Sequence, residues 1–570
     1  MDKRFHSNIY LPLILIVAGL AVYSNAFGGP FVFDDRPFIV ENEWIKSPGN
    51  FLMPAGLRYV GDLSFAINFY FNGLDTFGYH LVNIILHISN AVLLFFLVRG
   101  IFHTPVLRGA FASGRDGRLP ELAAFSVSAI FLVHPMQIQA VTYISQRYTS
   151  LAAFFYLASL VCFLRSRRAE GRGKARRFFY AVSLISTVMA MKTKEISFTI
   201  PFMMLIFDAA FFNGDRKLRG RALHLAPFFL AALIIPVSLI LPDFGILQSG
   251  NRVEELMRAH KLEEAGGISR YGYLLTQTKV IVTYIRLLFF PAHSGFTYHF
   301  PLSETIFEPA VLSASIALII LIFLAVYLFA RSVRAGNAWG LLVSLGLAWF
   351  FVTLSIESSV IPIKDAFNER RIYLPSIGMT LAFVSAVFYA REAVKKRWNM
   401  GLGAGTLTLL LCVVPGLPFS AATYARNDLW NDELSLYADE VRKNPYTTST
   451  HMYLGIEYYN RGMTDKALSE FMVSKKLNPS SVYVRRTLAT YYVNTGDYGK
   501  AIRETREILG IDSDNMEARY NLGVLYMSTG LLTEAEAELG EVLKLDGENR
   551  GARRALERIE KLKKRAGNFK

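Results

Sequence analysis

The sequence predicts an all-α protein in two parts, a polytopic membrane helical bundle of about 11 transmembrane helices and a C-terminal α-solenoid of short helical repeats. The chain of 570 residues is 52% hydrophobic and only 19% charged. Several of its apolar runs reach the roughly 18 to 20 residues that a helix needs to cross a bilayer core. After about residue 420 the long apolar runs stop, and a self-similarity with a spacing of 34 residues begins. We therefore predict a membrane domain over residues 1–420 and soluble helical repeats beyond it.

The predicted spans are apolar runs separated by short polar segments. Lys3 and Arg4 precede the first run and small residues follow it, so a cleaved signal peptide is an alternative interpretation of that run. A further apolar stretch, 271–291, contains Gln277, Lys279 and Arg286, and we expect it to lie in the outer interface rather than to span. The eleven predicted spans are 9–27, 79–102, 120–135, 148–164, 178–192, 196–212, 223–243, 309–330, 339–356, 373–390 and 399–419.

The basic residues fix the expected orientation. Five Lys- and Arg-rich loops, among them "RSRRAEGRGKARR" and "REAVKKR", fall on one side of the eleven spans, which the positive-inside bias assigns to the cytoplasm. The amino terminus is then cytoplasmic, and the repeats lie on the opposite side. These loops also account for the net charge of +15, so no nucleic-acid partner is expected. The two cysteines, Cys162 and Cys412, lie in separate apolar runs and predict no disulfide framework.

Three repeats begin at residues 448, 482 and 516. The eighth position of each is small (Gly455, Ala489, Gly523), as is the twentieth (Ala467, Ala501, Ala535), while the eleventh is tyrosine. Small residues at these positions let two antiparallel helices approach closely, which is the tetratricopeptide pattern. We predict a connecting helix or half repeat over 421–447, three repeats over 448–549 and a capping helix over 550–570. The repeats are expected to form a docking platform, with a spacer or a dimer contact as the alternative.

Two adjacent carboxylates, Asp34 and Asp35, follow the first span in "GGPFVFDDRPFIVEN". In an extended segment neighbouring side chains point to opposite sides, so one carboxylate is expected to face a substrate while the other holds the loop. Pro37 is expected to keep Arg36 extended and the segment out of a helix. An ionised carboxylate can accept a proton from an attacking hydroxyl. The alternative is that both merely end the span and face water.

Further polar residues are expected at outer span ends. Each of them alone is compatible with a snorkelling anchor, but ionisable groups against a membrane are costly unless they are paired or bind something. Together with the two Asp they predict a chamber with an acidic and a cationic side, where arginines could clamp a phosphate. The candidate binding residues are His134, Arg147, Lys194, Glu195, Glu369, Arg370, Arg371 and Tyr373.

Such a chamber suits the transfer of a sugar from a lipid-linked phosphosugar to a hydroxyl group. The nucleophile needs a base, and the departing phosphate needs cations. A carboxylate facing a cation across the sugar would fit displacement with inversion, by analogy with inverting glycosidases. No pair of histidines has metal-ligand spacing, and there is no Gly-rich phosphate loop. A divalent metal is therefore possible but unsupported, and no tightly bound cofactor is expected.

The motif order resembles one known family. "FDD", "HPMQIQAVTYISQRYTSLAAFFYLASL", "KTKEISFTIP", "ERRIYLPSIG" and "TYARNDLWNDELSLYADEVRKNP" occur in this sequence, the last running into the repeats. This order is similar to that of the transmembrane and tetratricopeptide-repeat-containing protein O-mannosyltransferases, which belong to the C-type glycosyltransferase superfamily. The resemblance implies a C-type glycosyltransferase fold and a polyprenyl-phosphate-linked sugar as co-substrate. It places Asp34 at the catalytic acidic position of the first outer loop, 28–78, and Asp35 beside it. Family motif positions are also occupied by Arg147, Lys194, Glu195, Glu369, Arg370 and Tyr373.

The resulting expectation is a glycosyltransferase of the bacterial inner membrane. It would move mannose or another hexose to Ser or Thr hydroxyls of periplasmic or secreted proteins that dock on the repeats. Its other partners would be membrane lipid and the lipid-linked donor. Two alternatives stay open at this point: a lipid or polysaccharide acceptor, and a non-enzymatic scaffold anchored in the membrane.

Overall fold

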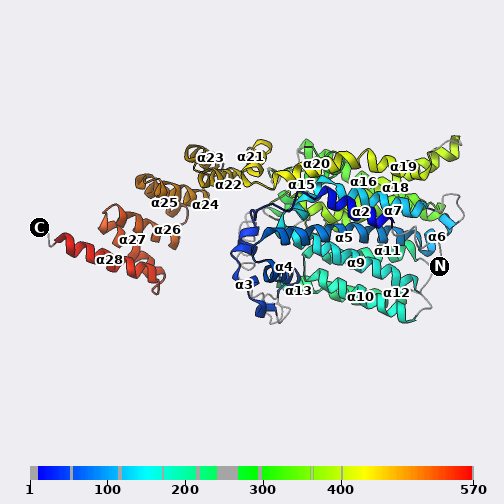
Figure 1. The fold of residues 1–570 in the computed structure, drawn as a ribbon, viewed down its shortest axis with the longest axis horizontal. Helices are drawn as coiled ribbons and strands as arrows, with labels where there is room; N and C mark the ends of the chain where they lie inside the picture. Colours follow the sequence, from blue (N-terminus) through cyan, green and yellow to red (C-terminus); the bar gives the residue numbers. More distant parts are fainter. Residues whose placement is uncertain are drawn as a thin grey trace. The chain divides into compact units, whose positions relative to one another are not determined.

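The computed structural model describes residues 10–51, 56–112, 118–169, 173–212, 218–240, 268–292, 295, 298, 300–359, 361–363, 365–398 and 402–567. Within these ranges the chain forms helices and loops and no β-strand. It divides into two compact units, Met1–Glu433 and Leu434–Lys570 (Figure 1). The predicted all-α class is confirmed. The division at residue 433 leaves open the finer domain boundaries expected from the sequence.

Each of the eleven predicted spans contains at least one helix. Six helices are long and apolar enough to cross a membrane, or seven if the bent pair Leu119–Val133 and Pro135–Val141 is one span, among the residues described. Two shorter apolar helices, Tyr10–Val22 and Ala338–Leu354, add to these. The number eleven therefore stays a prediction. The helices are α2 (Tyr10–Val22), α5 (Thr76–Phe102), α7 (Leu119–Val133), α9 (Arg147–Arg168), α10 (Gly173–Met191), α11 (Ile200–Phe211), α12 (Leu218–Ala232), α13 (Ile234–Ile240), α16 (Pro309–Ala335), α17 (Ala338–Leu354), α18 (Tyr373–Trp398), α19 (Ala404–Val413) and α20 (Gly416–Leu429).

The surface of this bundle is apolar where a soluble protein would be polar. Ile319, Phe323 and Val326 of α16 are 65%, 69% and 63% exposed. Contiguous exposed apolar side chains on a helix of 27 residues fit lipid contact, because lipid tails solvate them as well as a protein core does. The bundle is therefore a membrane domain, as the composition predicted.

Helices α17 and α18 touch backbone to backbone. A Cβ built on Gly346 of α17 would lie 2.4 Å from the carbonyl oxygen of Gly378 in α18, and the reverse contact is equally short. Only glycine fits at this crossing, because any side chain would collide with the opposite main chain. The two glycines thereby fix the spacing of the helices that carry the loop 355–372.

Helix α15 (Arg270–Phe289) lies along one end of the bundle. Near its start, the Tyr273 hydroxyl donates to the carbonyl of Glu357, which follows α17. Farther along, the Tyr284 hydroxyl donates to the carbonyl of Asn368, just before α18. Near its end, the Leu288 carbonyl bonds His134, which follows α7. Both halves of α15 thus contact loops at this end of the bundle. Its apolar residues also pack against Ala325 of α16 and Leu347 of α17, so the interfacial position stays a prediction.

Short helices and turns fill this same end. They are η1 (Arg36–Val40), α3 (Glu43–Lys46), η2 (Pro48–Phe51) and α4 (Tyr59–Asn72) in the first loop, with η3 (Pro135–Gln137), α8 (Ile138–Val141), η4 (Ile144–Gln146), η5 (Glu195–Thr199) and η7 (Glu369–Ile372) in later loops. The opposite end holds α6 (Pro105–Ala112), which follows the C-terminus of α5.

The expectation that Pro37 keeps the first loop extended is wrong. Arg36–Val40 form a short π-helix, and Asp35 at its N-cap is already in the right-handed helical region, with φ −62° and ψ −34°. Pro37 is tolerated because it occupies the first turn, where its missing N–H has no partner to lose.

The second unit is a stack of helix pairs. Its helices are α21 (Glu433–Lys443), α22 (Thr448–Asn460), α23 (Thr464–Leu477), α24 (Val482–Asn494), α25 (Tyr498–Ile511), α26 (Met516–Ser528), α27 (Leu532–Leu545) and α28 (Arg550–Gly567). A Cβ on Gly455 would lie 2.6 Å from the Phe471 ring, which explains the small residue at the eighth position. The turn within each pair uses a glycine with positive φ, at Gly462, Gly496 and Gly530. The three predicted repeats correspond to α22–α23, α24–α25 and α26–α27, and α28 packs Ala552 and Ile559 against the last pair.

Candidate active site

Asp35 holds the first loop against the start of α9. Its side chain is fully buried. One carboxylate oxygen accepts a hydrogen bond from the N–H of Ser145 at 2.6 Å, and the other accepts one from the N–H of Val32 at 3.0 Å. Burial raises the pKa of Asp35 to about 7, although the two backbone hydrogen bonds act in the opposite direction. Asp35 therefore organises the loop rather than facing a substrate.

Asp34 is presented differently from its neighbour. It is half-buried, and no hydrogen bond or ion pair joins its carboxylate to the part of the chain that the structure describes. Its position is nevertheless fixed, because its own N–H donates to the Tyr143 hydroxyl at 2.9 Å. The preceding Phe33 adopts a positive φ of 48°, which turns the chain sharply into the Asp pair. Asp34 is thus a positioned carboxylate with free acceptor capacity.

Tyr143 connects the acidic and cationic sides of this end of the bundle. Burial, then Asp34 and Asp35, raise the pKa of its phenol well above the usual value, and Arg370 acts in the opposite direction. Arg370 and Asp34 therefore lie close enough to the same side chain to affect its charge. Arg370 follows Glu369 in η7 and is half-buried. Its guanidinium has no hydrogen bond or ion pair within the described residues, so it can bind a ligand anion.

Lys194 is the second cation near Arg370. Its ammonium group forms an ion pair with a Glu357 carboxylate oxygen at 2.8 Å and donates to the Thr149 hydroxyl at 3.1 Å. Burial lowers the pKa of Lys194, Glu357 raises it again, and Arg370 lowers it through repulsion. The ammonium group has three donors, of which these two contacts use two. Lys194 is thus buried and Arg370 is half-buried, and the two positive charges lie close enough to repel one another.

Glu195, by contrast, forms an ion pair within the protein. Its carboxylate accepts hydrogen bonds from Arg58 at 3.2 and 3.4 Å. Burial raises the pKa of Glu195, but Arg58 and further hydrogen bonds outweigh burial and hold the pKa at about 2. Arg58 also lies over the Tyr148 ring, 5.3 Å from its centroid. This ion pair ties η5 to the start of α4.

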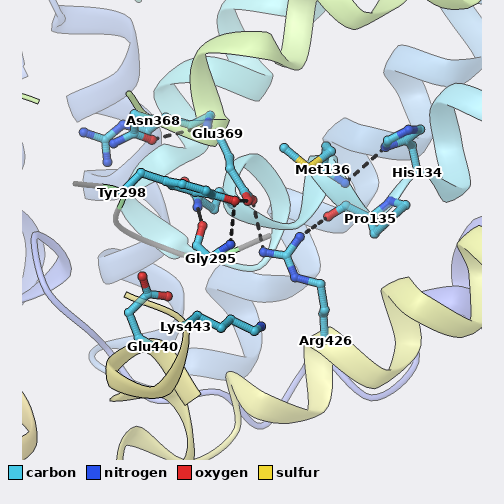
Figure 2. A network of polar contacts seen from close by, with 12 residues as sticks. His134, Pro135, Met136, Gly295, Tyr298, Asn368, Glu369, Arg426, Glu440 and Lys443 are labelled. Atoms are coloured by element: carbon cyan, nitrogen blue, oxygen red, sulfur yellow. Dashed lines mark hydrogen bonds and ion pairs between the residues drawn. The ribbon is translucent and has the colours of Figure 1, made fainter. Parts of the chain in front are cut away.

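Glu369 is also enclosed by protein partners, as Figure 2 shows. One carboxylate oxygen accepts from the Tyr298 hydroxyl at 2.8 Å, and the other pairs with Arg426 at 3.0 Å. Arg426 donates further to the Pro135 carbonyl at 2.8 Å. Glu369 is 0% exposed, so this network is a buried clamp that joins η7, η3 and α20. It positions the backbone from which Arg370 projects.

Arg371 and His134 also form hydrogen bonds within the protein. Arg371 is buried and donates to the Ala366 carbonyl at 3.0 Å. His134 accepts from the Met136 N–H through Nδ1 at 3.2 Å, and its Nε2 donates to the Leu288 carbonyl at 2.9 Å. Both nitrogens of His134 are therefore used within the protein.

Arg147 and Tyr373 lie deeper. The Arg147 guanidinium donates to the Asn83 side chain at 2.7 Å and to the carbonyls of Ser64 and Tyr79 at 3.1 Å each. The Tyr373 hydroxyl bonds His87 at 2.8 Å and Asn90 at 2.9 Å inside the bundle. The side chains of Arg147 and Tyr373 thus connect different helices by hydrogen bonds.

The structure thus separates the ten candidate residues into two classes. It brings Asp34 and Arg370 close to Tyr143 and Lys194 close to Arg370, and these three keep free or partly free polar groups. The other seven are committed to internal contacts that support this place: Asp35, His134, Arg147, Glu195, Glu369, Arg371 and Tyr373. Among the described residues no three His, Cys, Asp or Glu side chains gather into a group that could hold a metal ion.

Sequence reasoning missed three residues of this framework. Glu357 pairs with Lys194, Arg426 pairs with Glu369, and the Tyr143 hydroxyl accepts from Asp34. A signal existed for Glu357, a lone carboxylate directly after an apolar run. No local pattern marks Tyr143, because its role depends on a loop more than a hundred positions away.

Known proteins resemble this chain in its repeats and over most of its length. A tetratricopeptide-repeat family model matches residues 477–559. Over 483 residues the chain is 25% identical to a protein O-mannosyl-transferase of Caenorhabditis elegans, covering 82% of this chain and 62% of that protein. Over 511 residues it is 23% identical to the protein O-mannosyl-transferase TMTC1 of Homo sapiens, covering 81% of this chain and 54% of that protein. The chain thus spans about half to two thirds of the length of these curated relatives.

Among solved structures, the fold overlaps with an oligosaccharyltransferase of Archaeoglobus fulgidus tethered with an acceptor peptide. The TM-score is 0.44 at 14% sequence identity, over 75% of this chain and 55% of that chain. By sequence, the chain is thus similar to protein O-mannosyl-transferases over about four fifths of its length, and it has a C-terminal tetratricopeptide-repeat unit.

Proposed function

We propose that this chain is a membrane glycosyltransferase that moves a hexose from a polyprenyl-phosphate-linked donor to Ser or Thr hydroxyls of proteins. The names of its relatives support the reaction class. The observation that carries the assignment of the site is the contrast within the Asp pair, since Asp35 is buried and bonded whereas Asp34 is positioned without an internal partner. A carboxylate held in this way is suited to serve as a general base.

The proposed step is a single displacement. Asp34 takes the proton of the acceptor hydroxyl, and the hydroxyl oxygen forms a bond to the anomeric carbon of the sugar. The bond between that carbon and the phosphate oxygen breaks, and the electron pair leaves with the lipid phosphate. Arg370 and the third donor of Lys194 stabilise the charge that develops on this phosphate. A single displacement of this kind inverts the configuration at the anomeric carbon.

The other residues position these three. Asp35 fixes the loop on Ser145, and the Glu369–Arg426 clamp holds η7. Arg147 is assigned a positioning role rather than a phosphate-binding one, because its three donor groups bind protein acceptors. We further propose a bacterial inner-membrane location with the site and the repeats on the periplasmic side, where the repeats hold the acceptor protein.

The first test is Asp34→Asn in the purified full-length protein, assayed with a polyprenyl-phosphate hexose and an acceptor protein. Loss of a general base is expected to lower kcat by roughly 10²- to 10⁴-fold, with little change in the KM for the donor. Glu41→Gln is the matched control, because Glu41 is an exposed carboxylate in the same loop. Full activity of Asp34→Asn would contradict the assignment of the base.

The second test is Arg370→Gln. Removing one cation from the leaving phosphate is expected to lower the rate by roughly 10²- to 10³-fold. A donor with a better leaving group needs less stabilisation of the departing charge. Such a donor should therefore restore more of the lost rate in Arg370→Gln than in Asp34→Asn. An equal loss with every donor would mean that Arg370 does not act on the phosphate. Intact-mass analysis of periplasmic proteins then distinguishes a protein acceptor, which gains one hexose, from a lipid or polysaccharide acceptor.

A further inference from the structure

A second polar site lies at the other end of the bundle. Helix α9 starts beside Ser145, which binds Asp35, and its 22 residues carry the chain about 33 Å away, roughly the thickness of a bilayer core. Helix α5 runs in the same sense, since His80 near its start bonds the Gly29 carbonyl of the first loop. The C-terminal ends of α5 and α9 therefore meet on the side opposite to Asp34.

A pocket of about 240 Å³ lies between these two helix ends. Its polar wall consists of Arg99, His103, Arg165 and Arg168. Its apolar wall includes Phe96, one turn before Arg99 in α5, and Leu164, one turn before Arg168 in α9. The pocket is thus cationic toward the helix ends and hydrocarbon-like toward the bundle.

The positive charges of this pocket are only partly compensated. Arg99 pairs with Glu121 at 3.2 Å. Arg165 and Arg168 have no ion pair with the described residues, and Arg168 experiences repulsion from both Arg99 and Arg165.

Helix C-termini and snorkelling explain single arginines at such positions. They do not explain why three guanidinium groups converge on one pocket, where mutual repulsion costs free energy unless an anion lies between them. Arginine binds phosphate oxygens through two parallel donors, and basic pockets between spanning helices accept phospholipid headgroups. His103 adds a polar group, because its Nδ1 donates to the Arg99 carbonyl at 2.8 Å and its Nε2 remains available.

We propose that this pocket binds the phosphate of an anionic phospholipid, in the leaflet opposite to the Asp34 site. The apolar wall favours a lipid over a free phosphate ion, because Phe96 and Leu164 offer contact to the glycerol and acyl part of the molecule. The site is independent of the proposed glycosyl transfer. It would anchor the ends of α5 and α9 in a membrane that contains anionic lipid.

The test is lipid binding to the purified full-length protein by native mass spectrometry. Phosphatidylglycerol, phosphatidylcholine and inorganic phosphate are titrated separately. The wild-type protein is expected to retain one phosphatidylglycerol per chain under conditions that remove phosphatidylcholine. Arg165→Gln/Arg168→Gln is expected to weaken this retention by roughly 30-fold, since each basic residue near a membrane surface contributes about 1 kcal/mol.

The matched control is Arg334→Gln/Lys395→Gln. It removes the same charge from the exposed last turns of α16 and α18, on the same side but away from the pocket. Unchanged retention in Arg165→Gln/Arg168→Gln, or an equal loss in the control, would overturn the proposal. Equal retention of phosphatidylcholine by the wild-type protein would overturn it without any variant. Saturation by inorganic phosphate at the same concentrations as phosphatidylglycerol would overturn the assignment to a lipid.

Discussion

At the scale of residues, neighbouring side chains of the same kind have different duties. Asp34 and Asp35 are adjacent and chemically identical, yet only Asp35 is enclosed by backbone donors. Arg370 and Arg371 repeat this division, because Arg371 donates to the Ala366 carbonyl whereas the Arg370 guanidinium has no hydrogen bond or ion pair within the described residues. In both pairs the enclosed residue fixes the backbone from which the other one projects.

Asp35 also predicts a pH dependence of the first loop. Folding raises the pKa of Asp35 from 3.8 to about 7, so the folded loop holds a proton where the unfolded chain has lost it. The associated stability is fully present below the unfolded pKa and is lost as the pH rises through about 7. Hydrogen-exchange protection of residues 29–40, corrected for the intrinsic rate, is therefore expected to fall between about pH 4 and about pH 7 and to level off above that.

The variant Asp35→Asn tests the origin of this dependence. It is expected to lower protection at every pH, because one backbone donor loses its acceptor, and to flatten the pH profile. Glu41→Gln, in the same loop, should keep the wild-type profile. A wild-type profile in Asp35→Asn would assign the titration to another group.

At the scale of elements, the contact of α17 with α18 decides where the loop residues lie. Gly346 and Gly378 bring the two backbones together, and the loop between these helices carries both Glu357 and Arg370. Glu357 pairs with Lys194 of another loop at 2.8 Å, which leaves little room for a shift of α17. The spacing of two transmembrane helices thus determines the geometry of charges at their ends.

We expect Gly378→Ala to destabilise the membrane unit by about 1 to 3 kcal/mol, because the added methyl group collides with the α17 main chain. The measurement is the thermal unfolding midpoint of the purified protein in detergent. Gly405→Ala is the control, since Gly405 of α19 has open space around its Cβ position. Alanine there is expected to be neutral or to stabilise by up to about 1 kcal/mol. Equal midpoints for both variants would show that the glycine crossing is not tight.

At the scale of the whole molecule, the charges at the two ends of the membrane unit differ in kind. One end holds Asp34 with a framework of mixed ion pairs, and the other holds basic helix ends such as those of α5, α9 and α18. The positive-inside bias assigns the basic end to the cytoplasm. With this orientation, which stays a prediction, the proposed catalytic site would face outward.

Cysteine labelling tests this orientation. In a variant with Cys162→Ser and Cys412→Ser, we expect Glu43→Cys to react with a membrane-impermeant maleimide in intact cells with an opened outer membrane. Arg334→Cys is expected to react only after the inner membrane is permeabilised. Both positions are exposed in the structure, so access depends on the membrane alone. The reverse pattern would invert the topology, and labelling of both from one side would exclude an odd number of spans between them.

The sequence by itself determined the features that depend on local periodicity and hydropathy. It placed a helix in each of the eleven apolar runs, the three repeats, and the Asp pair after the first span, because these follow from residue type and spacing. It misjudged Pro37, since the loop is closed by distant contacts of Asp35 that no local preference reveals.

The tertiary structure alone decided which charges are available for chemistry. Arg147, Glu369 and Arg370 look alike as charged residues at span ends, but pairing depends on groups brought within about 3 Å from elsewhere in the chain. Asn83 accepts a hydrogen bond from Arg147, and Arg426 forms an ion pair with Glu369. The guanidinium donors of Arg370 have no such partner among the described residues. The physical reason is that a buried charge must be compensated by a neighbour in space, and neighbours in space are set by helix packing.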